Sequence, residues 1–156
     1  MPDLHELTAL DLGEALRRRE VSAEEATRHF LQRIERGNAA VGAVTGVAAE
    51  RAVERARALD AGASRSAPLW GLPIVDKELV RRAGQRTTFG SRLFADHVPE
   101  TDDELVQHLD AAGAISLGTS AAPEFGLPSY TASRVAPPAR SPYALDRGAG
   151  GSSGGA

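Results

Sequence analysis

The sequence G-G-S-S-G-G, from Gly150 to Gly155, decides how this chain is interpreted. It lies in the segment S-P-Y-A-L-D-R-G-A-G-G-S-S-G-G-A, from Ser141 to Ala156. Four glycines enclose Ser152 and Ser153, and glycine allows positive φ angles and close backbone approach. A Gly/Ser tract is typical of a flexible linker, so composition alone favours that interpretation. Two hydroxyls held in a glycine loop can also meet a substrate, an anion or a catalytic side chain.

The composition indicates a globular protein and excludes several kinds of chemistry. The chain has 156 residues, the size of one domain or part of a larger one, with 42% hydrophobic and 25% charged residues. A net charge of -3 and only 4% aromatics argue against a nucleic-acid partner. Cysteine is absent, which excludes disulfides and thiolate chemistry. No segment approaches membrane-spanning length, so we expect no membrane partner and a cytoplasmic location.

The first 68 residues indicate a mostly helical region. Thr8 with Asp11 is typical of a helix start, and Ser22 with Glu25 forms a clearer capping box. The second helix is expected to run to about Arg36 and to end at Gly37 and Asn38. The segment then predicts a short strand at 41–47 and a helix at 48–60.

Residues 69–156 indicate an α/β arrangement. We predict a strand at 70–75, a helix starting at a capping box from Thr101 to Glu104, and a strand at 114–117. Gly118 to Ser120 are expected to turn out of that last strand, and 121–140 to form an irregular, functional loop.

Lys77 directly follows the predicted strand at 70–75, between Asp76 and Glu78. A lysine flanked by carboxylates is usually an ion-pairing surface residue, although strand ends are where α/β folds commonly hold their sites. His97 and His108 lie on different elements, without the spacing of metal ligands. We therefore expect no metal and no cofactor.

Three segments together resemble the amidase signature family. G-L-P-I-V-D-K at 71–77 is similar to its G-x-P-x-x-x-K segment, and G-T-S-A-A-P-E-F-G at 118–126 to its G-K-T-N-x-P-E-F-G segment. Ser141-Pro142-Tyr143 with the glycine–serine tract resembles its N-P-Y…G-G-S-S-G-G signature. Each segment alone is weak, but their order and the separation of 75 positions from Lys77 to Ser152 outweigh the linker interpretation.

The resemblance implies an α/β fold with a mixed sheet covered by helices, of which 1–156 would be the amino-terminal portion of a single domain. It also implies hydrolysis or transfer at a carboxamide by a Ser-Ser-Lys triad. Lys77 matches the catalytic lysine, and Ser152 matches the bridging serine that follows a cis peptide. Ser153 matches the neighbouring signature serine, with a structural role. The family nucleophile lies roughly two dozen residues beyond the bridging serine, past Ala156, so we expect residues 1–156 alone to be inactive.

Some residues depart from the family pattern. Glu78-Leu79 stand where Asp-Asn is usual, Thr119 and Ala121 replace Lys and Asn, and 147–149 replace Arg-Thr-Pro. These changes affect substrate contacts and loop rigidity more than the triad. Asp76 could keep Lys77 charged if it pointed inward, but strand alternation predicts that it points away.

Three functions stay open. The first is a hydrolase acting on a small-molecule amide, and the second is the A subunit of an aminoacyl-tRNA amidotransferase, which works with partner subunits. The third is a non-catalytic, degenerate paralogue whose serine loop binds an anion or a partner. Homo-oligomerisation is also open. We further expect exposed apolar surface or an unpaired strand edge near Ile74 and Ile115.

Overall fold

The computed structural model describes residues 3–156, which form four α-helices, five strands and three short 3-10 turns within that range. The helices are α1 (Ala9–Arg17), α2 (Ala23–Val41), α3 (Ala49–Ala61) and α4 (Glu104–Ala111). The strands are β1 (Val44–Val47), β2 (Pro73–Lys77), β3 (Ile115–Ser120), β4 (Arg140–Ser141) and β5 (Ala144–Gly148). The 3-10 turns are η1 (Leu4–Glu6), η2 (Arg92–Phe94) and η3 (Glu124–Gly126).

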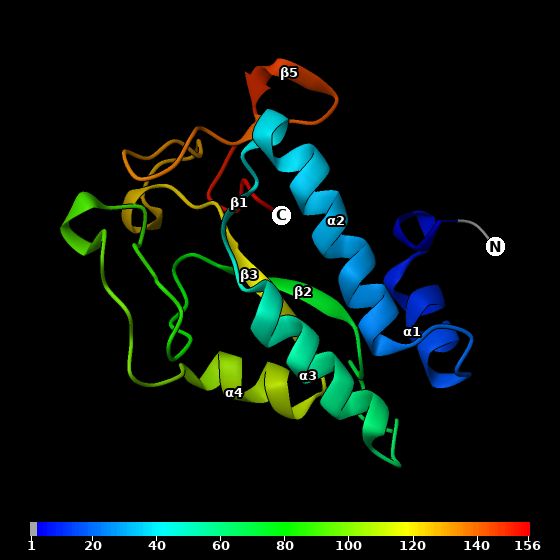
Figure 1. Cartoon of the computed structure of the whole chain (residues 1–156). Coiled ribbons are helices and arrows are strands. Elements are labelled where there is room, and N and C mark those ends of the chain that lie inside the picture. Colours follow the sequence, from blue (N-terminus) through cyan, green and yellow to red (C-terminus); the bar gives the residue numbers. More distant parts are fainter. Residues whose placement is uncertain (1–2) are drawn as a thin grey trace.

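A three-stranded sheet in the order β1-β3-β2 forms the centre of the fold (Figure 1). β3 pairs antiparallel with β1 and parallel with β2, so the sheet is mixed. α2 and α3 pack against each other and contact the sheet. The predicted α/β fold, a mixed sheet with covering helices, is confirmed.

Helix α2 begins where the sequence predicts and ends later. Ser22 is its N-cap, and the Ser22 hydroxyl accepts the backbone N–H of Glu25. The helix passes through Gly37 and ends at Gly42, whose backbone is left-handed and donates to the carbonyl of Asn38. The side chain of Asn38 bonds both backbone polar groups of Val44 in β1. The predicted end at Gly37 and Asn38 is therefore wrong, because Asn38 connects the last helical turn to the next strand.

Both strands next to the lysine are displaced from their predicted positions. β2 starts at Pro73 and includes Lys77, because Asp76 and Lys77 pair with Thr119 and Ser120 of β3. The predicted turn at 118–120 is consequently wrong, since those residues are the buried second half of β3.

The capping box predicted to start α4 is also wrong. The N-cap is Asp103, two residues after Thr101. The Asp103 carboxylate accepts the backbone N–H and the Nε of Arg81, at 2.8 and 2.9 Å. The N–H and guanidinium of Arg81 lower the pKa of Asp103. The tertiary partner has replaced the local cap.

Small aliphatic side chains build most of the core, as expected from the shortage of aromatics. Leu16, Val21 and several alanines of α2 and α3 pack with Ile115 and Leu117 of β3 and with Trp70. Ile115 is fully buried, so the prediction of exposed surface there is wrong. Ile74 lies in β2, an edge strand of the described sheet, and lines an apolar groove of about 460 Å³ beside α2. The expected unpaired edge is present at Ile74 only.

Residues 121–139 contain no strand and only the short turn η3, which agrees with the expected irregular loop. The hairpin of β4 and β5 follows and was not predicted. It lies beside the carboxyl end of α2, and the C-terminus lies beside β1 (Figure 1). No helix among residues 3–156 has the length and apolar character needed to cross a membrane.

Candidate active site

Lys77 and Ser152 meet at the carboxyl end of β2. The Lys77 Nζ donates a hydrogen bond of 2.7 Å to the Ser152 Oγ, and both residues are half-buried. Lys77 is fixed by the backbone pairing of β2 with β3. The backbone N–H of Glu78 continues that pairing with a bond of 3.0 Å to the carbonyl of Ser120. The two residues that the sequence singled out are therefore brought into direct contact.

The serine loop is held in place by its last glycine. Gly155 is buried, and its N–H donates to the carbonyl of Ala121 at 3.2 Å, just past the end of β3. The N–H of Ala121 in turn donates to the carbonyl of Ala43 at 2.8 Å. A Cβ on Gly155 would collide with that Ala43 oxygen and lie 2.5 Å from the Ala121 nitrogen. The close approach requires glycine at 155 and places the loop against the sheet.

The peptide bond between Gly151 and Ser152 is cis. A cis bond before the bridging serine is what the family resemblance implies at this position. A Cβ on Gly151 would lie 2.7 Å from the carbonyl carbon of Ser129, so the irregular loop packs against the serine loop here. Ser153 is exposed, and its carbonyl accepts the N–H of Ala156 at 3.1 Å. Its structural role stays a prediction.

Asp76 lies on the opposite side of β2 from the Lys77–Ser152 contact. Its carboxylate accepts bonds from the Arg82 Nε at 2.6 Å and from the Ser116 Oγ at 2.7 Å. The prediction that Asp76 points away from the Lys77 site is confirmed by these buried partners. The sequence did not point to Arg82 or Ser116, because neither belongs to a motif. Arg82 also follows another arginine in a loop, and nothing in the sequence marks it as buried.

Two of the residues that depart from the family pattern are buried and bonded. Glu78 accepts a hydrogen bond from the hydroxyl of Thr88 through one carboxylate oxygen, and its other oxygen has no partner among residues 3–156. The Thr119 hydroxyl lies 3.2 Å from that of Thr45, which links β3 to β1. The substitution at 119 therefore places a contact between strands where the family pattern has a long cationic side chain.

The described residues offer the hydroxyl and amine of a proton relay. Between Asp3 and Ala156, no group of three or more His, Asp or Glu side chains is arranged to hold a metal ion. A serine hydroxyl bonded to a lysine amine at the end of a strand can move a proton between a reacting group and the amine. Serine–lysine arrangements of this kind occur among hydrolases that act by nucleophilic attack.

The fold and the Lys77–Ser152 pair thus define an α/β protein with a serine–lysine site. Similarity to known proteins identifies its family. The chain belongs to the amidase family, whose model matches residues 25–156. It is 45% identical over 156 residues to the A subunit of the glutamyl-tRNA(Gln) amidotransferase of Nitratidesulfovibrio vulgaris, covering 99% of this chain and 32% of that protein. The chain thus spans about a third of the length of this curated relative.

Solved structures give the same family. A bacterial aryl acylamidase of the amidase signature family superimposes with a TM-score of 0.90 at 27% identity, over 96% of this chain and 32% of that one. The A subunit of the glutamyl-tRNA(Gln) amidotransferase of Thermotoga maritima superimposes with a TM-score of 0.78 at 26% identity, over 99% and 31%. The backbone therefore follows the aryl acylamidase more closely at nearly equal sequence identity.

Proposed function

We propose that this chain is the amino-terminal part of an amidase that cleaves small carboxamides by an acyl-enzyme mechanism. Lys77 and Ser152 are two members of a Ser-Ser-Lys triad, and the nucleophilic serine lies in polypeptide that follows Ala156. The observation that carries the proposal is the 2.7 Å bond between the Lys77 Nζ and the Ser152 Oγ. Family membership supports it.

The first half of the reaction needs a base. An amide is a poor electrophile, so the nucleophilic serine must lose its proton as its oxygen attacks the carbonyl carbon. The Ser152 Oγ takes that proton and passes its own to the Lys77 Nζ. Lysine can accept the proton only in its neutral form, when its nitrogen carries a free electron pair. Backbone N–H groups must stabilise the oxyanion of the tetrahedral intermediate.

The second half returns the proton. The Lys77 ammonium gives a proton to Ser152, and Ser152 gives one to the leaving nitrogen as the C–N bond breaks. The amine departs, and the acyl group stays on the nucleophilic serine as an ester. Water then attacks the ester carbon, the same pair takes its proton and returns it to the nucleophilic serine as the acyl C–O bond breaks, and the free acid is released. Ser152 serves both halves because its hydroxyl both donates and accepts.

A second candidate function is that of an amidotransferase A subunit, which moves nitrogen from an amide to an aminoacyl-tRNA with partner subunits. The 45% identity to the relative from Nitratidesulfovibrio vulgaris favours it. The higher TM-score with the aryl acylamidase favours the stand-alone amidase. We place the amidase first because Thr119 and Ala121 depart from the usual family segment, and both side chains are buried.

The test compares the polypeptide of residues 1–156 with the longer polypeptide encoded by the full reading frame that contains them. Each is purified and given an anilide, a linear aliphatic amide, and glutamine with glutamyl-tRNA(Gln), and released amine or ammonia is measured. The amidase predicts hydrolysis by the longer polypeptide alone and none by residues 1–156. Transfer to tRNA only when partner subunits are added would favour the second function. Absence of both activities from the longer polypeptide would overturn the proposal.

A further inference from the structure

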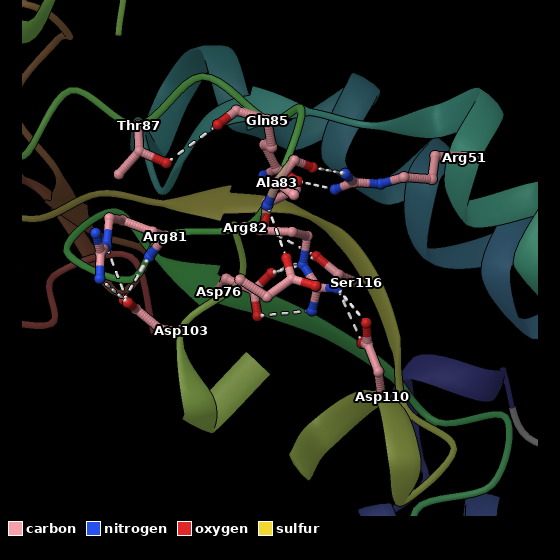
Figure 2. A network of polar contacts seen from close by, with 12 residues as sticks. Arg51, Asp76, Arg81, Arg82, Ala83, Gln85, Thr87, Asp103, Asp110 and Ser116 are labelled. Atoms are coloured by element: carbon pink, nitrogen blue, oxygen red, sulfur yellow. Dashed lines mark hydrogen bonds and ion pairs between the residues drawn. The ribbon is translucent and has the colours of Figure 1, made fainter. Parts of the chain in front are cut away.

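A buried ionic cluster surrounds Asp76, the residue that precedes Lys77 in β2 (Figure 2). The guanidinium of Arg82 is bonded to Asp76 at 2.6 Å on one side. On the other side it donates to both carboxylate oxygens of Asp110, in α4, at 2.9 and 2.7 Å. The side chains of Arg82 and Asp76 are only 8% and 1% exposed, whereas that of Asp110 is 40% exposed. Arg82 therefore supplies the positive charge that pairs with the buried Asp76 carboxylate.

Arg82 is itself held in the cluster strongly. Burial alone would lower the pKa of its guanidinium, but hydrogen bonds and charges from Asp76 and Asp110 outweigh burial and raise it. Ser116 of β3 adds a third bond to the Asp76 carboxylate, at 2.7 Å. The charged groups around this end of β2 are Asp76, Glu78, Arg82, Asp102, Asp110 and, on α3, Arg51.

Asp76 and Lys77 occupy neighbouring positions of β2. An unpaired carboxylate near an amine in a protein interior favours the charged ammonium over the neutral amine. The base that a Ser-Ser-Lys triad needs is the neutral amine. An aspartate beside the lysine is thus harmful to that chemistry unless a cation neutralises it.

We propose that Arg82 is a positioning residue for the candidate active site, which neutralises Asp76 and holds the end of β2 so that Lys77 meets Ser152. The role rests on the proposed function of Lys77 as a base. Arg82 touches neither Lys77 nor the substrate in this assignment, since it acts through Asp76. The bond from Arg82 to Asp110 also connects the cluster to α4. The serine loop contacts the same strand, β2, through Lys77.

The chain offers a direct readout of this charge effect. Lys77 is the only lysine among the 18 lysine and arginine residues. Labelling with ¹³C,¹⁵N-lysine therefore gives a single side-chain NMR signal, whose movement with pH reports the protonation of the Lys77 amine. Residues 1–156 can be used without any enzyme activity. If the longer polypeptide were inactive, the proposed function would be overturned, but the NMR titration of Lys77 in the Arg82 and Asp76 variants would be unaffected.

Two substitutions in the pair are expected to move the titration in opposite directions. Arg82→Gln leaves Asp76 unneutralised, so the Lys77 signal should move with pH at higher pH than in the unmodified chain. Asp76→Asn leaves Arg82 in place, so Lys77 should titrate at lower pH by a similar amount. The double variant should return close to the unmodified chain. A merely structural role predicts the same direction for both single variants, because each would loosen the same strand.

Controls keep the test decisive. Arg81→Gln is the matched control, because it removes a neighbouring, exposed arginine outside the Asp76 cluster and should leave the Lys77 signal unmoved. Removing one partner of a buried ion pair often unfolds a protein, so Arg82→Gln could fail to fold. Asp76→Asn and the double variant then carry the test, since neither leaves a buried carboxylate unpaired at position 76. An unchanged or raised titration in Asp76→Asn would overturn the proposal.

Discussion

The Lys77 Nζ and the Ser152 Oγ lie 2.7 Å apart although the two residues are 75 positions apart in the sequence. In the longer polypeptide, Lys77→Ala and Ser152→Ala should each lower the kcat for amide hydrolysis by about 10²- to 10⁴-fold, because each breaks the proton relay. Lys77→Arg should be as inactive as Lys77→Ala, since a guanidinium keeps its proton at any pH that the protein tolerates. Steady-state release of the amine measures all three.

Ser153→Ala is the matched serine control for this prediction. Ser153 is exposed, and its hydroxyl is not the one bonded to Lys77. A loss of less than about tenfold is expected, well below the contribution of a positioned acid–base group. A loss for Ser153→Ala equal to that for Ser152→Ala would contradict the assignment of Ser152 as the relay.

Gly155→Ala should destabilise the fold, because its added Cβ would collide with the carbonyl of Ala43. Overpacking of this kind costs about 1–3 kcal/mol in the free energy of unfolding. Gly37→Ala is the matched control, since Gly37 lies inside α2 with no atom within 4 Å of an added Cβ. That change should stabilise by about 0.5–1 kcal/mol. Urea unfolding followed by circular dichroism compares them, and equal effects would argue against the close approach.

Asp60 caps a helix to which it does not belong. Its two carboxylate oxygens accept the N–H groups of Ala23 at 3.0 Å and Glu24 at 2.9 Å, in the first turn of α2. Asp60→Ala should lower the free energy of unfolding by about 0.5–2 kcal/mol, the usual value of a lost cap. Asp146→Ala, at an exposed position of β5, should change it by less than about 0.5 kcal/mol. If thermal unfolding showed the same loss of stability for Asp60→Ala and Asp146→Ala, the capping role of Asp60 would be contradicted.

His29 gives the fold a pH dependence. Burial is the first cause that lowers its pKa from 6.5, and the charge of His5 is the second. The His5 Nδ1 lies 3.1 Å from the His29 Nε2. The opposing charge of Asp3 raises the pKa less, and Arg33 and Arg36 lower it further. The folded state therefore favours neutral His29.

The sign of the effect follows from proton binding. Below about pH 6.5 the unfolded chain binds more protons at His29 than the folded chain does, so stability falls as the pH drops from there toward the lower folded pKa. Above pH 6.5 the full contribution is present. Urea unfolding at pH 7.5 and 5.5 should show a smaller loss for His29→Gln than for the unmodified chain. His108→Gln, at an exposed position of α4, should keep the unmodified loss, and the same response from both variants would count against His29.

A local signal predicted the start of α2, and sequence motifs singled out Lys77 and Ser152, which the fold brings into contact. Ser22 and Glu25 are close in sequence, so their capping interaction needs no tertiary information. Lys77 and Ser152 were recognisable because each lies in a motif with a fixed residue type. The mixed sheet followed from the same resemblance rather than from periodicity, since β1 has only four residues.

Tertiary contacts explain what local signals missed. Asp103 replaced Thr101 as the N-cap of α4 because Arg81, 22 residues earlier, engages its carboxylate. The turn expected at Gly118 is a strand because β1 and β2 pair with both edges of this segment. The pairing of Arg82 with Asp76 and Asp110 joins a loop, a strand and a helix, and no short-range pattern contains all three.

The central position of β3 constrains how the chain acquires its fold during synthesis. β1 and β2 do not pair with each other, because each pairs only with β3, which is the last of the three to be made. The contacts between α2 and α3 join segments that are near each other in the sequence, so this helix pair can form early on the ribosome. The two outer strands must wait, with their backbone groups bonded to water, until β3 emerges between them. Lys77 therefore cannot take up its paired position in the sheet until Ser120, its partner in β3, has been made.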